Sequence, residues 1–347
     1  MTTDPDVLQA IHGVVHYVVY HLTRAITVPI QRDSYLYWPF IVSTALIAAV
    51  AIRRLAGPGM GGASGSWRHV LGARLWWHPS SRADYRLYFA NALVLPLVLS
   101  PLQFSDDQFA GWASRVLGLE SAASQATGAA DAGGRLLFSL AFFVAYDFGR
   151  FVAHSLLHDV PFLWPFHKVH HSAQVLTPIT AFRVHPVDLL VMAWVPALAT
   201  GLTTWLFNRV TDTPVSVYTF LGLHVLIWAF NLIDNLRHSP VWLTYGPTLG
   251  KWLLSPAHHQ LHHSYEPRHM GCNRGFDIAL WDRLWGTLYV PSGPPEQFRM
   301  GLGDGSDGEW NGLMKLYFRP FMEAVQVLTG RRKAAEPDSG RSHASAD

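Results

Sequence analysis

Cysteine and charged residues are the two kinds of side chain that this sequence has little of. The 347 residues include one cysteine, Cys272. A disulfide framework is therefore excluded, and so are the thiolate ligands of zinc fingers and iron–sulfur clusters, which leaves nitrogen and oxygen to hold any metal. Asp, Glu, Lys and Arg make up 14% of the chain, whereas soluble domains average about 25%, and this deficit favours a membrane protein.

An excess of charge of one sign is also missing. The formal net charge is +2, and no basic stretch is interleaved with aromatic residues, which excludes nucleic-acid binding. Residues 1–6 are polar and acidic rather than basic before an apolar core, so we expect no cleavable signal peptide. We expect residues 1–330 to form a single membrane-embedded domain, followed by a disordered tail at 331–347 that is rich in Lys, Arg, Ala, Ser and Gly.

Long apolar segments are what the sequence has instead. Five segments approach the roughly 20 residues that cross a bilayer: 35–52, 85–104, 136–152, 189–207 and 215–233. The last two are expected to form a helical hairpin, and residues 7–26 are amphipathic, as in a helix on a membrane surface. Buried core helices of a soluble protein are the alternative, but five such segments exceed an ordinary core. The sequence therefore predicts an all-α, integral-membrane helical bundle.

The charges of the loops predict the orientation of this bundle. Six arginines lie between residues 53 and 86, which suits the cytoplasm. The next loop carries Asp106, Asp107, Glu120 and Asp131 against Arg115 alone, which suits the opposite side. Counting the segments from there places the end of the third segment, and everything after residue 233, on the cytoplasmic face.

Histidine is abundant, with 19 residues against 26 of Lys and Arg together. Three clusters have regular spacing: one HxxxH and two HxxHH. Residues three and four apart share one face of a helix, so each cluster directs its rings into one small volume. Eight imidazoles exceed the six that one octahedral ion accepts, so the clusters predict a di-metal site in a cytoplasmic, histidine-rich helical cap. The eight are His154, His158, His167, His170, His171, His259, His262 and His263.

The identity of the metal follows from ligand type and surroundings. Imidazole suits zinc, copper, iron and nickel. A structural zinc site uses four ligands and would rarely recruit eight histidines without a cysteine. The clusters adjoin a membrane-buried, apolar space, and breaking an unactivated C–H bond there requires redox chemistry that zinc does not perform. Iron is therefore favoured; surface histidines at a membrane interface would explain one cluster but not three.

These motifs resemble the fatty-acid hydroxylase and sterol desaturase superfamily. The resemblance covers residues 146–291, with no such signal before residue 134, and rests on YDFGRFVAHSLLHDVPFLWPFHKVHH, FRVHP, NLRHSPVWLTYG, SPAHHQLHHS and NRGFDIALWDRLWGTLYVP. It implies an oxygen-dependent, integral-membrane enzyme with two iron ions that acts on acyl chains, sterols and related lipids. It also implies that the eight histidines are ligands, with His238 and His185 as further candidates. Many relatives carry a histidine shortly before the Asn235 position, where this chain has Ile233 and Asp234, so His238 or Asp234 must complete one shell.

Other polar residues lie within the apolar segments. Asp147, Arg150, His154 and His158 form one stripe along the third segment, and ionisable groups in a span usually face the bundle interior. We expect Asp147 to orient His154 or a neighbouring ring through its Nδ1–H, or else to pair with Arg150. His224, in the fifth segment, is expected to make a hydrogen bond inside the bundle rather than to bind metal.

The resulting hypothesis is a di-iron oxidoreductase that uses dioxygen to hydroxylate a membrane lipid. Desaturation of the lipid by the same site is the alternative; an acyl chain, sterol, alkylglycerol or carotenoid are all possible substrates. No GxGxxG precedes a helix and no haem or iron–sulfur module is appended, so electrons must come from a separate ferredoxin- or cytochrome-type donor. A membrane cytochrome or a metal transporter would place its histidines at depth in different spans rather than in clusters at one face.

Overall fold

The computed structural model describes residues 5–55, 67–102, 104–116, 131–211, 215–291 and 293–331. These residues are mostly helical, as predicted, and their one sheet is a small hairpin of β1 (Thr219–Phe220) and β2 (Leu223–His224). Residues 117–130 of the predicted acidic loop and residues 332–347 of the predicted tail lie outside the described residues.

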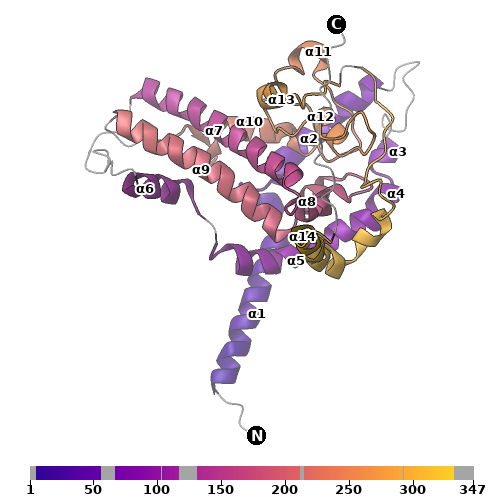
Figure 1. The fold of residues 1–347 in the computed structure, drawn as a ribbon, viewed down its shortest axis with the longest axis horizontal. Helices are drawn as coiled ribbons and strands as arrows, with labels where there is room; N and C mark the ends of the chain where they lie inside the picture. The colour runs from indigo at the N-terminus through magenta and orange to yellow at the C-terminus, as the bar shows by residue number, and fades with distance from the viewer. Residues whose placement is uncertain are drawn as a thin grey trace.

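Two long helices, α7 (Ala132–Asp159) and α9 (Pro186–Thr211), lie side by side (Figure 1). Among the described residues these two helices are long and apolar enough to cross a membrane, by length and composition. They contain the third and fourth of the five predicted segments, and the other three do not form such helices. The backbones of α7 and α9 approach closely at Gly149, which has no Cβ atom. A Cβ atom added there would lie 2.6 Å from the Cα atom of Pro196. Large apolar side chains such as Leu137 and Leu206 remain exposed on their outer surfaces.

The fifth predicted segment does not form a spanning helix, so the predicted helical hairpin of segments four and five is wrong. Residues 219–224 turn through Leu221 and Gly222, both with positive φ, and only α10 (Val225–Asp234) is helical. Ten residues of helix are about 15 Å long, half of a bilayer core. The turn is fixed by His224, whose Nε2–H donates to the Ser139 carbonyl at 2.9 Å and whose Nδ1 accepts from the Leu226 N–H. The predicted internal hydrogen bond of His224 is confirmed.

The first two predicted segments correspond to α2 (Trp38–Leu55) and α5 (Pro79–Leu99). Helix α5 begins six residues before the predicted segment and ends at Leu99, five residues before its predicted end. Its first turns bury polar side chains, including Ser80 and Asp84. The shift arises because those polar groups find partners in the histidine-rich region, a contact that an apolar pattern does not record.

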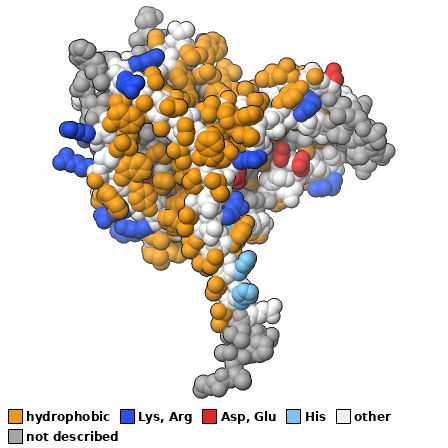
Figure 2. Space-filling model, turned by 180° about the vertical axis from the view of Figure 1, so that it is seen from behind, with side chains coloured by type: hydrophobic (Ala, Val, Ile, Leu, Met, Phe, Trp, Pro, Cys, Tyr) orange, Lys and Arg blue, Asp and Glu red, His pale blue; other side chains and the backbone are white. Residues whose placement is uncertain are grey.

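The amphipathic N-terminal segment forms α1 (Pro5–Ile26), which projects from the body of the molecule (Figure 1). The hydroxyl of Tyr17 donates to the Leu93 carbonyl, and that of Tyr88 donates to the Ala25 carbonyl, which attaches α1 to α5. Figure 2 shows apolar side chains over much of one face of the body and along α1.

The remaining elements are short and gather mainly around the end of the α7–α9 pair where α7 ends and α9 begins (Figure 1). Helix α6 (Asp106–Val116) is an exception, because it packs against α9 near Gly201. The others are η1 (Val28–Ile30), α3 (Trp67–Val70), α4 (Ala73–Trp76), α8 (Trp164–His171), η4 (Pro178–Phe182), α11 (Gly246–Leu249), α12 (Pro256–His262), α13 (Leu280–Trp285), η5 (Asp307–Asn311) and α14 (Leu313–Leu328).

Candidate metal centre

Nine buried histidine side chains converge in two groups at this end of the molecule. Within each group, one ring nitrogen from every residue lies within 4.8 Å of all the others. We call them the five-histidine group and the four-histidine group. The first contains His154, His158, His167, His171 and His262, and the second contains His170, His238, His259 and His263. The structure thus brings together nine of the ten histidines proposed from the sequence as ligands.

The prediction that each cluster directs its rings into one volume is wrong for both HxxHH motifs, because helical periodicity divides each of them between the two groups. Successive residues of a helix are turned by about 100° about its axis. The first and fifth residues of an HxxHH motif therefore lie on one face, and the fourth residue points to the side of that face. On α8, His167 and His171 therefore join the five-histidine group while His170 joins the other. Around α12 the assignment is reversed. His262 joins the five-histidine group, and His259 and His263 join the four-histidine group.

Hydrogen bonds at Nδ1, on the side of the ring that faces away from the centre of the group, fix the tautomers of three rings in the five-histidine group. The Nδ1 atoms of His154 and His262 lie 2.7 Å from the carbonyl oxygens of Arg274 and Cys272. The Nδ1 atom of His167 lies 2.7 Å from Oδ2 of Asp188. A carbonyl or ionised carboxylate only accepts, so each Nδ1 carries the hydrogen and each Nε2 presents a lone pair to the group's centre.

Those lone pairs face one another at short range. Nε2 of His154 lies 2.9 Å from Nε2 of His167, and Nε2 of His158 lies 3.2 Å from Nε2 of His154 and of His262. With hydrogens on Nδ1, no hydrogen is left between His154 and His167, and two lone pairs repel unless a cation lies between them. Metal–nitrogen bonds of about 2.0–2.1 Å place ligands at right angles about 2.9 Å apart, so the arrangement fits a bound metal ion.

The four-histidine group has the same inward arrangement with weaker support. Nε2 of His259 lies 2.9 Å from Nε2 of His238 and 3.1 Å from that of His263. Nε2 of His238 lies 3.3 Å from that of His170, whose Nδ1 is 3.3 Å from the Arg183 carbonyl. In the described part of the chain, Nδ1 of His259 and of His263 has no hydrogen-bond partner. This group also fits a metal ion.

Burial keeps several of these rings neutral, which is the form that binds metal. Removal from water lowers the pKa of His170 and of His262 to about 3. Burial also lowers the pKa of His171 and His238 well below the usual value, and the neighbouring rings add to the effect. At neutral pH these four rings therefore offer lone pairs without first losing protons.

Two residues proposed from the sequence lie elsewhere. His185 joins neither group: its Nδ1 accepts from the Val187 N–H at 3.1 Å, and its Nε2–H donates to the Tyr317 carbonyl. The expected contact from Asp147 to His154 is not formed. Asp147 instead accepts from the Asp277 N–H at 3.0 Å and from the Trp281 indole at 2.8 Å.

The alternative pairing of Asp147 with Arg150 is not formed either. Nη1 of Arg150 lies 3.9 Å from Oδ2 of Asp277. The Arg150 guanidinium also lies 3.6 Å from the centre of the Phe276 ring. Of the two residues proposed to complete a shell, His238 lies in the four-histidine group, whereas Asp234 forms an ion pair with Arg237 at 2.7 Å.

The carboxylate that does orient a ring is Asp188, which sequence reasoning missed. It lies in the first turn of α9 and is buried against His167. A single acidic residue at the head of a long apolar segment was the available signal, because such groups are costly in a membrane and usually serve a function.

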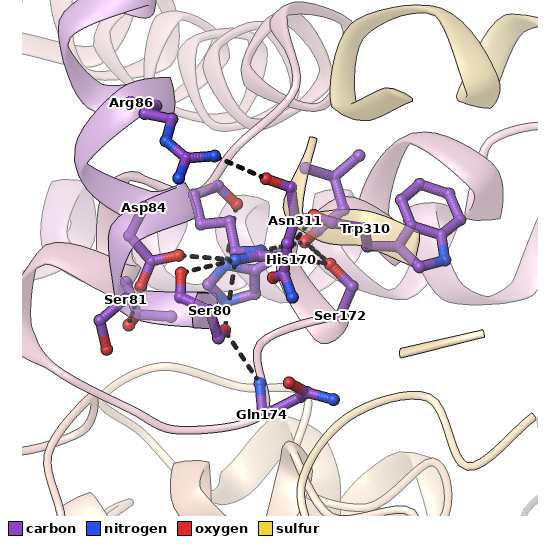
Figure 3. A network of polar contacts seen from close by, with 12 residues as sticks. Ser80, Ser81, Asp84, Arg86, His170, Ser172, Gln174, Trp310 and Asn311 are labelled. Atoms are coloured by element: carbon purple, nitrogen blue, oxygen red, sulfur yellow. Dashed lines mark hydrogen bonds and ion pairs between the residues drawn. The ribbon is translucent and has the colours of Figure 1, made fainter. Parts of the chain in front are cut away.

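Arg183 is a second residue that sequence reasoning missed. Its guanidinium is fully buried and donates to Asp84, Ser172 and the Trp310 carbonyl, at 2.8, 2.8 and 2.9 Å. These partners come from α5, from the residue that follows α8 and from η5, and Figure 3 shows Asp84, Ser172 and Trp310 in one network with His170 beside them. These contacts hold Arg183 in place, and the carbonyl of Arg183 accepts from Nδ1–H of His170.

A cavity of about 330 Å³ adjoins the five-histidine group. His158, His171 and His262 form one part of its wall. The rest of the wall comes from Asp159 and Pro161, from α8, from residues 264–271 and 301–304, and from α14. A cavity of about 480 Å³ between α7, α9 and α10 contacts none of the nine histidines.

Comparison with known proteins identifies relatives of this region. Residues 139–287 match the family model described as fatty acid hydroxylase. The chain is 31% identical over 154 residues to an ornithine lipid hydroxylase of Rhizobium tropici, 28% over 153 residues to an alkylglycerol monooxygenase of Xenopus tropicalis, and 31% over 153 residues to a Delta(7)-sterol 5(6)-desaturase of Gibberella zeae. These alignments cover 43–44% of this chain and 30–42% of the relatives. No solved structure matches.

Proposed function

We propose that this chain, which belongs to the fatty-acid hydroxylase and sterol desaturase superfamily, hydroxylates a C–H bond of a membrane lipid with dioxygen and two iron ions. The observation that carries the proposal is the set of Nε2 lone pairs that face one another at 2.9–3.3 Å in two buried groups. A buried arrangement of this kind is stable when a cation lies at the centre of each group.

The two histidine groups would hold one ion each, and the bound iron would supply dioxygen activation and hydrogen-atom removal. The chain's own residues do the rest. Asp188 and the carbonyls of Arg274 and Cys272 hold the rings in one tautomer and orientation. The cavity beside His158, His171 and His262 positions the substrate carbon and limits the access of water.

The location of this chemistry is part of the proposal. We infer that residues 1–330 form one multi-pass membrane domain in which α7 and α9 span the bilayer and the histidine groups lie at the cytoplasmic face. The arginine excess between residues 53 and 86 supports this orientation. Electrons would come from a separate ferredoxin- or cytochrome-type donor.

Desaturation is the second candidate, because one relative is named as a desaturase. Both outcomes begin with the removal of one hydrogen atom. Return of oxygen gives an alcohol, and removal of a second hydrogen gives an alkene. Two of the relatives are named as a hydroxylase and a monooxygenase, which favours the alcohol.

The test combines metal analysis with isotopic labelling. Protein purified without oxygen should contain about two iron atoms per chain, because the rings exceed the capacity of one ion. Membranes that carry the enzyme and a reductase system are then exposed to ¹⁸O₂, and their lipids are analysed by mass spectrometry. Label in a new hydroxyl supports the proposal, a new double bond without label supports desaturation, and one zinc with activity retained would contradict the di-iron assignment.

A further inference from the structure

We propose that α14 lies in the surface of the bilayer, on the side of the histidine groups, and frames the entrance through which a lipid passes into the cavity beside the five-histidine group. The exposed face of α14 is then covered by the acyl chains of that leaflet. The inference rests on the proposed function in two ways. The position of α14 assumes that α9 crosses the bilayer, and the entrance also assumes that a lipid is oxidised at the histidine groups.

The exposed face of α14 is apolar along its whole length. Large apolar side chains recur there at intervals of three or four residues, which places them on one side of the helix. The helix has 16 residues, a length of about 24 Å, which is too short to cross the roughly 30 Å of a bilayer core. An apolar face on so short a helix suits a position along the bilayer surface. Six residues, each 48–68% exposed, form this stripe: Met314, Phe318, Phe321, Met322, Val325 and Leu328.

The opposite face of α14 is attached to the protein. Leu316, Glu323 and Ala324 are buried there. The Glu323 carboxylate accepts from Nε–H of Arg319 at 2.8 Å and lies 3.7 Å from Nζ of Lys168 on α8. The apolar stripe is therefore a fixed outer surface of the folded chain, because the helix cannot turn it inward without breaking these contacts.

The contacts of α14 place it at the level where α9 begins. Nε2–H of His185, the residue directly before α9, donates to the Tyr317 carbonyl at 3.1 Å. The Tyr317 hydroxyl donates to Oδ1 of Asn91, where the apolar half of α5 begins, at 2.6 Å. Figure 1 shows α14 beside α5 and α8. Where α9 enters the bilayer, the exposed stripe of α14 therefore meets acyl chains.

The sequence after α14 favours a bilayer over a protein as the occupant. Arg331, Arg332 and Lys333 follow shortly after Leu328, the last residue of the helix. Basic residues beside an apolar helix face attract the anionic lipid heads of the cytoplasmic leaflet. Interfaces between proteins instead combine apolar residues with direct hydrogen bonds and a polar rim, whereas all six exposed residues of the stripe are apolar.

The inner side of the same helix lines the cavity. Val327 forms part of the cavity wall together with the ligand candidates His158, His171 and His262. Val325, two residues earlier, belongs to the exposed stripe. The helix thus stands between the bilayer and the cavity, and its diameter is only about 10 Å. A lipid that passes beside α14 therefore reaches the ligand rings without leaving the membrane surface.

Spin labelling of the full-length protein in nanodiscs tests the position of α14. Single cysteines replace Met322, in the stripe, and Gln326, an exposed residue on the polar edge of the same helix. The parent protein, whose Cys272 is buried, corrects for background labelling. The accessibility of each nitroxide to oxygen, which concentrates in acyl chains, is divided by its accessibility to a water-soluble nickel chelate. We expect this ratio to be several-fold higher for Met322→Cys than for Gln326→Cys.

A third label, at Leu206→Cys on the exposed surface of α9, reports whether that helix lies in the bilayer. A high ratio at Leu206 with equal ratios at Met322 and Gln326 would overturn the position of α14. A Met322 label that neither reagent reaches would mean that a protein covers the stripe, which would also overturn it. Low ratios at both Leu206 and Met322 would refute the proposed membrane location, and this inference with it.

The entrance is tested by filling it. Val327→Trp adds a large ring at the cavity wall and should reduce lipid oxidation at least about tenfold, while the metal content stays that of the parent protein. Val327→Phe is the milder variant if the larger ring lowers the metal content. Gln326→Trp adds the same ring on the polar edge of α14 and is the matched control, with oxidation unchanged.

Oxidation at the parent rate in a metal-loaded Val327→Trp or Val327→Phe enzyme would overturn the entrance. If the parent protein itself oxidises no lipid, the proposed function fails, whereas the accessibility ratios still decide where α14 lies.

Discussion

The two histidine groups differ in how their rings are held from behind. In the five-histidine group, Asp188 and two backbone carbonyls accept from three Nδ1 atoms at 2.7 Å. In the four-histidine group, one carbonyl lies 3.3 Å from an Nδ1 atom, and two Nδ1 atoms are buried without a hydrogen-bond partner among the described residues. Partners behind a ligand fix its orientation and raise its basicity, and their loss typically costs 10–100-fold in metal affinity. We therefore predict that the five-histidine group would bind a metal ion more tightly than the four-histidine group.

The largest expected effect comes from removing a ring of the better-supported group. His262→Ala should abolish lipid oxidation and reduce the metal content from about two ions per chain to about one. Nε2 of His262 lies 3.2 Å from Nε2 of His158, and Nδ1–H of His262 donates to the Cys272 carbonyl. His12→Ala, on the exposed surface of α1, is the control and should retain both metal and activity. An active His262→Ala enzyme with a full metal content would refute the site.

Chelation should separate the two groups without any mutation. We expect one ion to be removed at chelator concentrations about 10–100-fold lower than the other, because the partners behind the rings differ. Elemental analysis along a chelator titration measures the two steps. His238→Ala should eliminate the more labile step; if it eliminates the tighter one, the order of affinities is the reverse of ours.

Asp188→Asn should bring the two groups closer together in affinity. The asparagine amide keeps the shape but loses the charge that holds Nδ1–H of His167 at 2.7 Å. We expect the tighter chelation step to move by about tenfold. Asp131→Asn is the matched control at the other end of the α7–α9 pair, where Asp131 accepts from the Gly134 N–H as the N-cap of α7. Metal binding that is unaffected by Asp188→Asn would remove the basis of the comparison.

The smallest effect is expected at His185, which lies outside both groups. His185→Ala removes the acceptor for the Val187 N–H at the start of α9, and it should cost about 1 kcal/mol of stability while both ions remain bound. Loss of an ion in this variant would mean that His185 belongs to a metal shell after all.

The pH dependence of that stability has a definite sign. Burial lowers the pKa of His185 to about 4 in the folded protein, from about 6.5 in an unfolded chain. The folded state therefore binds fewer protons between these values. The contribution of His185 is fully present above about pH 6.5 and is lost as the pH falls towards 4. Thermal unfolding from pH 7.5 to 4.5 should show a smaller decline in His185→Ala than in the parent protein.

The sequence by itself determined the features that arise within single helices. The apolar runs at 136–152 and 189–207 correspond to α7 and α9. The spacings of three and four residues determined which histidines face inward, because the period of a helix is set by its own backbone hydrogen bonds. Eight of the nine histidines that converge lie in these motifs, whereas His238 lies outside them. The same periodicity accounts for the division of each HxxHH motif between two groups.

Only the tertiary structure decided which groups accept hydrogen bonds from the Nδ1 atoms of those rings and where the apolar segments end. His154 receives its support from Arg274, 120 residues away, and His262 from the Cys272 carbonyl. Asp147, close to His154 along α7, instead accepts from the Asp277 N–H and from the indole of Trp281 at the start of α13. The fifth segment is apolar enough for a span but is interrupted by the hydrogen bond from His224 to Ser139. Contacts between distant parts of a chain depend on how its helices pack, and a local pattern of residues does not record that packing.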